Sequence, residues 1–244
     1  MGPAAQARGR DAPIALIPLT VRHVYDFGED RPLVGDDLVR PEAWDALRTQ
    51  TSGPFAMPAD RADWEAEAAG VSSLVDRARA INAWLDGQSI SSVASYGVGG
   101  ASLEFLLWRE APTRRLVLSD YGPATVDRLR TVFPEVEVRQ FDLLADPPLS
   151  ADIHLFHRID TEFDNATWRD VLRRFADQRI LFAASDLIGH RRAREVRARQ
   201  HNPDVTSAGW LRNRAAMHLL WRRTHSATHL RMHDLHAWDL QPRR

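Results

Sequence analysis

The chain has 244 residues, enough to bury one sizeable core, and its 32 basic residues are all arginines. Lysine and cysteine are both absent, which excludes Schiff-base and P-loop chemistry, disulfides, thiolate nucleophiles and cysteine zinc sites. The net charge of −1 conceals an asymmetry, because residues 186–244 hold 12 arginines against 5 acidic residues. Such a basic region either meets an acidic partner or forms a solvated helix face, and we favour the solvated face.

The N-terminal part of the chain is punctuated by proline and glycine. Residues 1–12 have no apolar period and are expected to be disordered. The apolar run at residues 13–19 is too short for a signal peptide or a membrane span and is broken by Pro18, so we expect a soluble cytoplasmic protein. A short helix is predicted to begin at Pro41. We interpret residues 1–59 as a flexible N-terminus and a cap or lid segment.

A regular alternation of strands and helices follows. Residues 60–86 are helical in pattern, and Gly70 indicates either a kink or two helices. The expected strands are residues 91–95, 115–119, 136–141, 152–156 and 179–184. Repeated strand–helix units of this length predict a parallel sheet with helices on both faces.

The pattern changes after Ser185. An arginine-rich helix is predicted over residues 188–199 and a second helix over residues 210–221. Two short strands at residues 228–232 and 236–240 close the chain. Because no helix separates these two strands, we expect at least one of them to run antiparallel to the rest of the sheet.

A glycine-rich turn follows the first strand of the alternation, in the segment Ser95-Tyr96-Gly97-Val98-Gly99-Gly100-Ala101. Glycine permits positive φ and close backbone approach, and the following helix presents unpaired N–H groups to a ligand. Asp120 ends the next strand and Asp142 follows the third. Since ligands of open α/β sheets bind beyond the carboxyl ends of the strands, this pattern predicts a nucleotide-like cofactor there.

The arrangement resembles the class I S-adenosylmethionine-dependent methyltransferases over about residues 60–241. In that family the first strand carries an acidic-x-Gly-x-Gly-x-Gly motif, and here Ser95 stands at the acidic position and Ala101 at the last glycine. The resemblance implies an α/β fold, a three-layer Rossmann-like sandwich. It further implies a mostly parallel seven-stranded sheet with an antiparallel C-terminal strand, and an N-terminal helical or irregular cap. Residues 60–244 would then form the methyltransferase core.

The resemblance also implies S-adenosylmethionine as the cofactor. Asp120 lies where the family places the acid that accepts both ribose hydroxyls, a task that suits the two acceptor oxygens of a carboxylate. Asp142 matches the acid that meets the adenine amino group, and a tyrosine face near the sulfonium would add a cation–π attraction. The predicted cofactor-binding residues are Ser95, Tyr96, Gly97, Val98, Gly99, Asp120, Tyr121, Asp142, Leu143 and His157.

The segment after the fourth strand is where chemistry is expected. Methyl transfer from a sulfonium is an in-line displacement, which requires alignment and needs a base only when the nucleophile holds a proton. His157 is the candidate base, with Asp160 or Glu162 orienting it or binding a substrate cation; the alternative is that these residues cap the next helix or face water. The candidate lid residues over the acceptor are His23, Tyr25 and Phe27, for which simple packing is the alternative.

We therefore expect S-adenosylmethionine-dependent methylation of a small-molecule acceptor, of the kind found in specialised metabolism. No metal is assigned, because the spacing of His225, His229, His233 and His236 is not specific for one. We expect no membrane partner, and the missing Asn/Asp-Pro-Pro-aromatic signature argues against nucleic acid. The alternatives are an RNA methyltransferase that uses the basic C-terminal region, a nicotinamide-dependent oxidoreductase, and a non-catalytic binding protein with this fold. The acceptor atom and the oligomeric state stay open.

Overall fold

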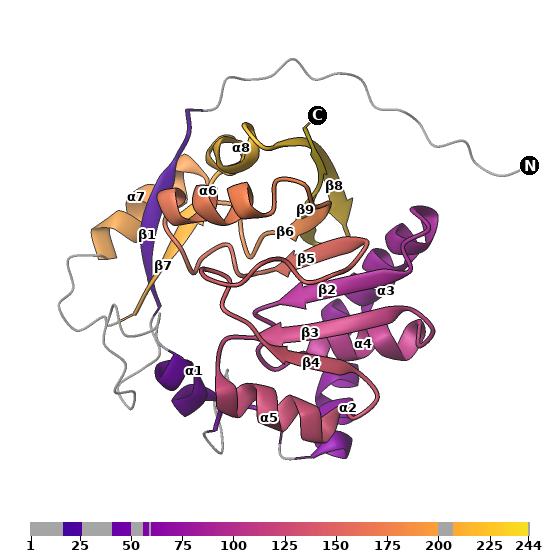
Figure 1. Ribbon diagram of the computed structural model, residues 1–244. Coiled ribbons are helices and arrows are strands. Elements are labelled where there is room, and N and C mark those ends of the chain that lie inside the picture. The colour runs from indigo at the N-terminus through magenta and orange to yellow at the C-terminus, as the bar shows by residue number, and fades with distance from the viewer. Residues whose placement is uncertain (1–16, 26–40, 50–55, 59, 200–206, 244) are drawn as a thin grey trace, which may run out of the picture.

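The computed structural model describes residues 17–25, 41–49, 56–58, 60–199 and 207–243 (Figure 1). A seven-stranded sheet forms the middle layer, in the order β4-β3-β2-β5-β6-β9-β8. Its strands are β2 (Ser92–Tyr96), β3 (Arg115–Asp120), β4 (Glu137–Gln140), β5 (Ile153–His157), β6 (Ile180–Ala183), β8 (His225–Met232) and β9 (Leu235–Pro242). Strands β2 to β6 are parallel, whereas β9 runs antiparallel to both β6 and β8. The predicted sheet, with its antiparallel C-terminal pair, is confirmed.

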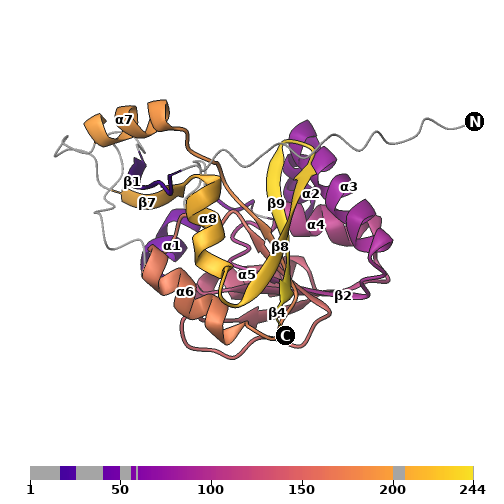
Figure 2. The same ribbon diagram turned by 90° about the horizontal axis from the view of Figure 1, so that it is seen from above.

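Helices cover both faces of this sheet (Figures 1 and 2). One face carries α2 (Arg61–Gly70), α3 (Ser72–Gly87), α4 (Ser102–Glu110) and α5 (Pro123–Val132), and the other carries α6 (Asn165–Arg174) and α8 (Arg214–Trp221). Gly70 ends α2, so the segment predicted as kinked or double is two helices.

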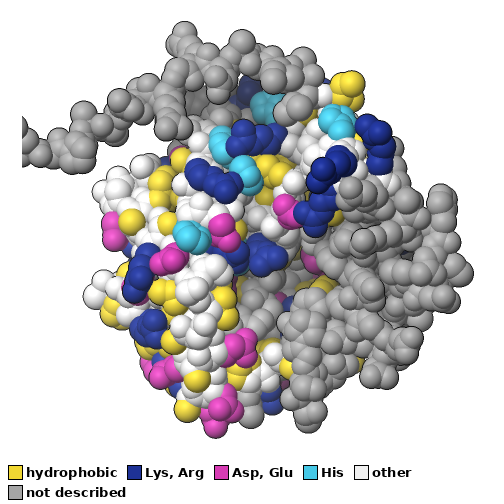
Figure 3. Space-filling model, turned by 180° about the vertical axis from the view of Figure 1, so that it is seen from behind, with side chains coloured by type: hydrophobic (Ala, Val, Ile, Leu, Met, Phe, Trp, Pro, Cys, Tyr) yellow, Lys and Arg dark blue, Asp and Glu magenta, His cyan; other side chains and the backbone are white. Residues whose placement is uncertain are grey.

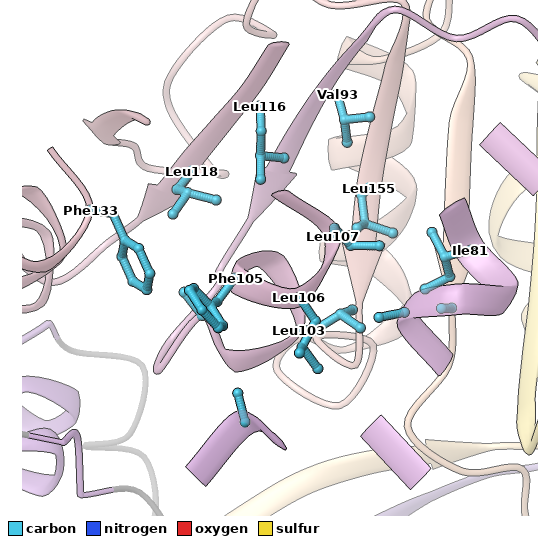
Figure 4. Close-up of a cluster of buried hydrophobic side chains, with 14 of the residues drawn as sticks. Ile81, Val93, Leu103, Phe105, Leu106, Leu107, Leu116, Leu118, Phe133 and Leu155 are labelled. Carbon is cyan, nitrogen blue, oxygen red and sulfur yellow. The ribbon is translucent and has the colours of Figure 1, made fainter. Parts of the chain in front are cut away.

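The alternation of side chains along each strand explains why two separate apolar layers form. In β2, Val93 packs with α3 and α4, whereas the neighbouring Ala94 packs with the layer beneath α6. Figure 4 shows side chains of the first layer, among them Phe105 and Leu106 from α4, Val93 from the sheet and Ile81 from α3. Burial on both faces fixes the register of the strands, and therefore the positions of their carboxyl ends.

A second, two-stranded sheet lies beyond the carboxyl ends of the parallel strands, beside α1 (Pro41–Arg48) (Figure 1). It pairs β1 (Thr20–Tyr25) with β7 (Ser207–Arg212) in antiparallel register, and α7 (His190–Arg199) packs on it. The prediction of helix at Trp210 and Leu211 is wrong, because these residues belong to β7 and α8 begins only at Arg214. The side chain of Asn213 caps that helix by accepting from the Ala216 N–H at 2.9 Å.

Arg212, at the end of β7, is a fully buried arginine that ties this ribbon to the loop after β5. Its Nε donates to Asn165 Oδ1 at 2.7 Å, and its other nitrogens donate to the carbonyl oxygens of Asp160 and Phe163. These bonds hold the loop that carries the predicted catalytic residues. No helix in the described part of the chain is both long and apolar enough to cross a bilayer.

Candidate functional site

The glycine turn after β2 requires residues without side chains at two positions. Gly97 has φ of +63° and Gly99 has φ of +55°. A Cβ on Gly97 would lie 2.9 Å from Ile159 Cγ2, and the Val98 N–H donates to the carbonyl oxygen of Ser119 at 3.2 Å. The turn is therefore held between β3 and the loop after β5.

Gly97→Ala is expected to lower the free energy of unfolding by about 2–4 kcal/mol, because it combines left-handed strain with a clash in a packed position. Urea denaturation measures the change. Gly70→Ala is the matched control, since a Cβ there would meet nothing within 4 Å. Equal stability of the two variants would contradict the packing described for Gly97.

Asp120 organises the carboxyl end of β3 and is 3% exposed. Its Oδ2 accepts from the Gly99 N–H at 2.9 Å, and its Oδ1 accepts from the Gly122 N–H at 3.1 Å. Asp120 therefore links the glycine turn to the carboxyl end of β3. The same Oδ1 also forms an ion pair with Arg48 Nη1 at 2.7 Å.

Arg48 belongs to α1, which lies across this end of the sheet. Its Nη1 also donates to Thr125 Oγ1 at 2.9 Å, and its Nη2 lies 3.3 Å from the position that a Cβ of Gly99 would take. Asp45, one turn earlier, accepts from the N–H groups of Ala124 and Thr125 at 3.1 Å each and so caps the start of α5. The Arg48 guanidinium thus occupies the space beside Asp120 where the sequence predicts a ribose.

Ser95 stands where the glycine motif has an acid, and an acidic side chain from another element lies beside it in space. The Ser95 hydroxyl donates to Glu104 Oε1 at 2.8 Å, and both side chains are buried. Burial raises the pKa of Glu104 to about 7, with a further upward contribution from Asp120. A carboxyl group therefore lies beside the end of β2, although it comes from α4 and not from the strand.

The loop after β5 brings two of the three predicted catalytic residues close together. Glu162 is half-buried, and burial raises its pKa to about 7; Asp160, Arg48 and Asp120 also act on it electrostatically. Asp160 is fully buried, its Oδ1 accepts from the Ser185 N–H at 2.7 Å, and its Oδ2 has no hydrogen-bond partner. Burial raises the pKa of Asp160 as well.

His157 lies in different surroundings. Its pKa is lowered to about 3, mainly by desolvation and further by the positive charges of Arg158 and Arg77. The Asp234 carboxylate acts in the opposite direction and raises the pKa of His157. Its Nε2 is buried without a hydrogen-bond partner. The ring therefore faces α3 and the β8–β9 turn, and a pKa this low makes it a poor base at neutral pH.

The remaining predicted residues are spread more widely. The Tyr96 ring is buried among Phe141, Phe156 and Phe175, and its hydroxyl bonds to His154 Nδ1 at 2.9 Å, so the cation–π role predicted for this ring does not fit its position. Tyr121 is 38% exposed beside Asp120.

Asp142 and Leu143 follow β4, an edge strand of the seven-stranded sheet. Asp142 caps its own turn, since its Oδ1 accepts from the Leu144 N–H at 2.7 Å, and Leu143 packs against the layer under α6. His23 and Tyr25 are on β1, but their side chains lie outside the described residues, as does the whole of Phe27.

Sequence reasoning missed Arg48, Asp45, Glu104 and Arg212. Only Glu104 carried a signal in the sequence, because it is an acid in the first turn of a helix whose neighbouring residues are apolar.

No family model and no curated protein matches this sequence. Solved structures do match. Human N-acetylserotonin methyltransferase in complex with S-adenosylmethionine is 16% identical, with a TM-score of 0.56, over 68% of this chain and 52% of that one. The chain has the class I methyltransferase fold.

Two further structures share this methyltransferase fold. Mitomycin 7-O-methyltransferase MmcR is 17% identical, with a TM-score of 0.55, over 70% of this chain and 54% of its own. The N,N-8-amino-8-demethyl-D-riboflavin dimethyltransferase RosA from Streptomyces davawensis is 18% identical, with a TM-score of 0.52, over 67% of this chain and 53% of that one. The chain thus spans about half the length of the solved chains it matches.

Proposed function

We propose that this protein binds S-adenosylmethionine beside Asp120 and transfers its methyl group to a small organic acceptor. The observation that carries the proposal is the buried Asp120 carboxylate, which holds the glycine turn through Gly99 and pairs with a cation from α1. The residues present fit the cofactor, because Asp120 lies close enough to both Glu104 and Glu162 to act on them electrostatically, and a cationic ligand near these carboxyl groups would be stabilised.

Each residue has a distinct role in this proposal. Asp120 would hold the ribose hydroxyls, and the carboxyl groups of Glu104 and Glu162 would stabilise positive charge near the glycine turn. When bound, S-adenosylmethionine supplies a methyl group activated by a sulfonium. Of the three candidate catalytic residues, Glu162 has the pKa best suited to accepting a proton from an acceptor, because a pKa of about 7 matches the working pH of a general base.

The small-molecule acceptor is supported by the neighbours in the fold. Their names give N-acetylserotonin, mitomycin and an aminoriboflavin as acceptors of those proteins. The division into a cap at residues 1–59 and a core at residues 60–244 fits the position of α1 and β1 at the carboxyl edge of the sheet. The lid role of His23, Tyr25 and Phe27 remains part of this proposal.

Cofactor affinity is expected to rise as the pH is raised through 7. Glu104 and Glu162 have raised pKa values of about 7, so their carboxyl groups are neutral below this pH and become negatively charged above it, where they attract a sulfonium. Calorimetry one unit below and one unit above pH 7 measures the effect. S-adenosylhomocysteine, which lacks the sulfonium charge, should show a smaller change, and an affinity that falls with pH would contradict the assignment.

Binding without catalysis is the second candidate function, and the surroundings of His157 favour it, since the candidate base lies beside Arg77 and Asp234 and its pKa is lowered to about 3. Turnover separates the two. A methyltransferase releases S-adenosylhomocysteine when given a panel of hydroxylated and amino aromatic acceptors, and Glu162→Gln should lower this rate even at a cofactor concentration that saturates the variant. A protein that binds the cofactor and methylates no acceptor would support the second function.

A further inference from the structure

Four basic side chains meet where the β8–β9 hairpin approaches the start of α8: Arg214, His229, Arg231 and His236, here called the Arg–His corner. The imidazole rings of His229 and His236 are stacked with centroids 5.3 Å apart, and His229 Nε2 lies 3.1 Å from His236 Nδ1. Arg231 Nη1 donates to His236 Nε2 at 2.7 Å, and Arg214 Nη2 lies 3.1 Å from His229 Nε2. Figure 3 shows histidine and arginine side chains gathered on this face of the molecule.

The hydrogen bonds of the corner leave donors without acceptors. Arginine can only donate, so His236 Nε2 accepts from Arg231 and the proton of a neutral His236 lies on Nδ1. That proton is donated to His229 Nε2, which places the proton of a neutral His229 on its Nδ1. In the part of the chain that the structure describes, no acceptor bonds to the remaining guanidinium N–H groups or to this Nδ1–H, which leaves them for solvent or a ligand. A group made entirely of donors fits an oxyanion.

The charge of the corner is also uncompensated. Within the described residues, no carboxylate forms an ion pair with Arg214 or Arg231. The carboxylate that acts on His236 is Asp186, which already pairs with Arg192 of α7. Desolvation and the neighbouring positive charges lower the pKa of His229 to about 4 and also lower the pKa of His236. An anion in the corner would reverse this effect.

The corner lies at the same edge of the sheet as the proposed cofactor site. The N–H of Ala184, just after β6, donates to the carbonyl oxygen of His236 at 3.0 Å, so β9 begins where β6 ends. In the strand order, β9 is two steps from β5, or about 10 Å at the usual strand spacing. A small molecule can span that distance from the loop that carries Glu162.

We propose that the Arg–His corner is an oxyanion-binding site that receives the acidic group, carboxylate or phosphate, of the methyl acceptor. The acceptor role rests on the proposed function, whereas binding of the oxyanion does not. The anion accepts from Arg214, Arg231 and His229 together, and it favours protonation of the two imidazoles. Affinity for the anion therefore rises as the pH falls.

The test uses the full chain, with inorganic phosphate and acetate as probes at constant ionic strength. Imidazole resonances followed by NMR should show saturable binding of at least one probe, with the pKa of His229 raised from its low starting value. Tighter phosphate binding identifies a phosphorylated acceptor, and acetate binding of at least equal strength identifies a carboxylate. Arg214→Gln and Arg231→Gln should each weaken binding about tenfold. Arg222→Gln, which removes an exposed arginine just after the C-terminal end of α8, should leave it unchanged.

Two results would overturn the site. One is a pKa of His229 that does not move with either probe at millimolar concentration, and the other is an equal loss of binding in Arg222→Gln. Calorimetry with S-adenosylmethionine on the same variants separates this proposal from the proposed function. Phosphate or acetate binding without S-adenosylmethionine binding contradicts only the proposed function, and the reverse contradicts only the oxyanion site.

Discussion

Asp120→Asn is expected to weaken binding of S-adenosylmethionine by about ten- to a hundredfold. The amide keeps one acceptor oxygen but loses the negative charge, and a hydrogen bond to a charged group contributes about 1.5–3 kcal/mol. Isothermal titration calorimetry on the wild type and the variant measures this difference. Asn is preferred to Ala, because the side chain also accepts from the backbone N–H groups of Gly99 and Gly122.

Asp127→Asn is the matched control for that experiment. Asp127 is an exposed carboxylate on α5 that pairs with Arg130, so its neutralisation changes the net charge equally without touching the site. Thermal denaturation checks that both variants are folded. If Asp120→Asn binds the cofactor as tightly as Asp127→Asn does, Asp120 does not hold the ribose.

Arg48→Ala is expected to tighten binding of S-adenosylmethionine by about five- to thirtyfold, the factor that corresponds to about 1–2 kcal/mol. The Arg48 guanidinium bonds to the Asp120 carboxylate that the ribose would use, so on this account the cofactor binds only when this ion pair is open. The apparent dissociation constant is the intrinsic one divided by the fraction of molecules in which the pair is open. Removing the guanidinium raises that fraction.

Asp45→Asn tests the same idea while leaving both Arg48 and Asp120 in place. Asp45, one turn before Arg48, ties α1 to the start of α5 by accepting from the N–H groups of Ala124 and Thr125, so its neutralisation should loosen α1 and also tighten cofactor binding, by a smaller factor. Weaker binding in Arg48→Ala would show instead that Arg48 takes part in holding the cofactor. In that case α1 would be part of the binding site and not its competitor.

Much of the fold could be predicted from the sequence because local patterns and tertiary packing agree there. The strand that ends at Tyr96 is apolar and short, glycines follow it, and Asp120 ends the next strand, so the turn and the acid meet because parallel strands present their carboxyl ends at one edge. The antiparallel ending followed from the lack of a helix between the last two strands. The two helices around Gly70 followed from the conformational cost of a glycine within a helix.

Other features depend on contacts between distant segments, which a single sequence does not encode locally. Trp210 and Leu211 look helical beside the pattern of α8, but pairing with β1, nearly 190 positions earlier, makes them a strand. Arg48 is one arginine among many, and only the position of α1 brings it to Asp120. Glu104 could be recognised as a counterpart of Ser95 only once α4 was placed against β2.

The central claim is that the Asp120 carboxylate binds S-adenosylmethionine in competition with Arg48. Calorimetric titration of the wild type, Arg48→Ala and Asp120→Asn with S-adenosylmethionine under one set of conditions tests it most directly. We predict the tightest binding in Arg48→Ala, intermediate binding in the wild type and the weakest in Asp120→Asn. No binding to folded Arg48→Ala at millimolar cofactor would contradict the claim.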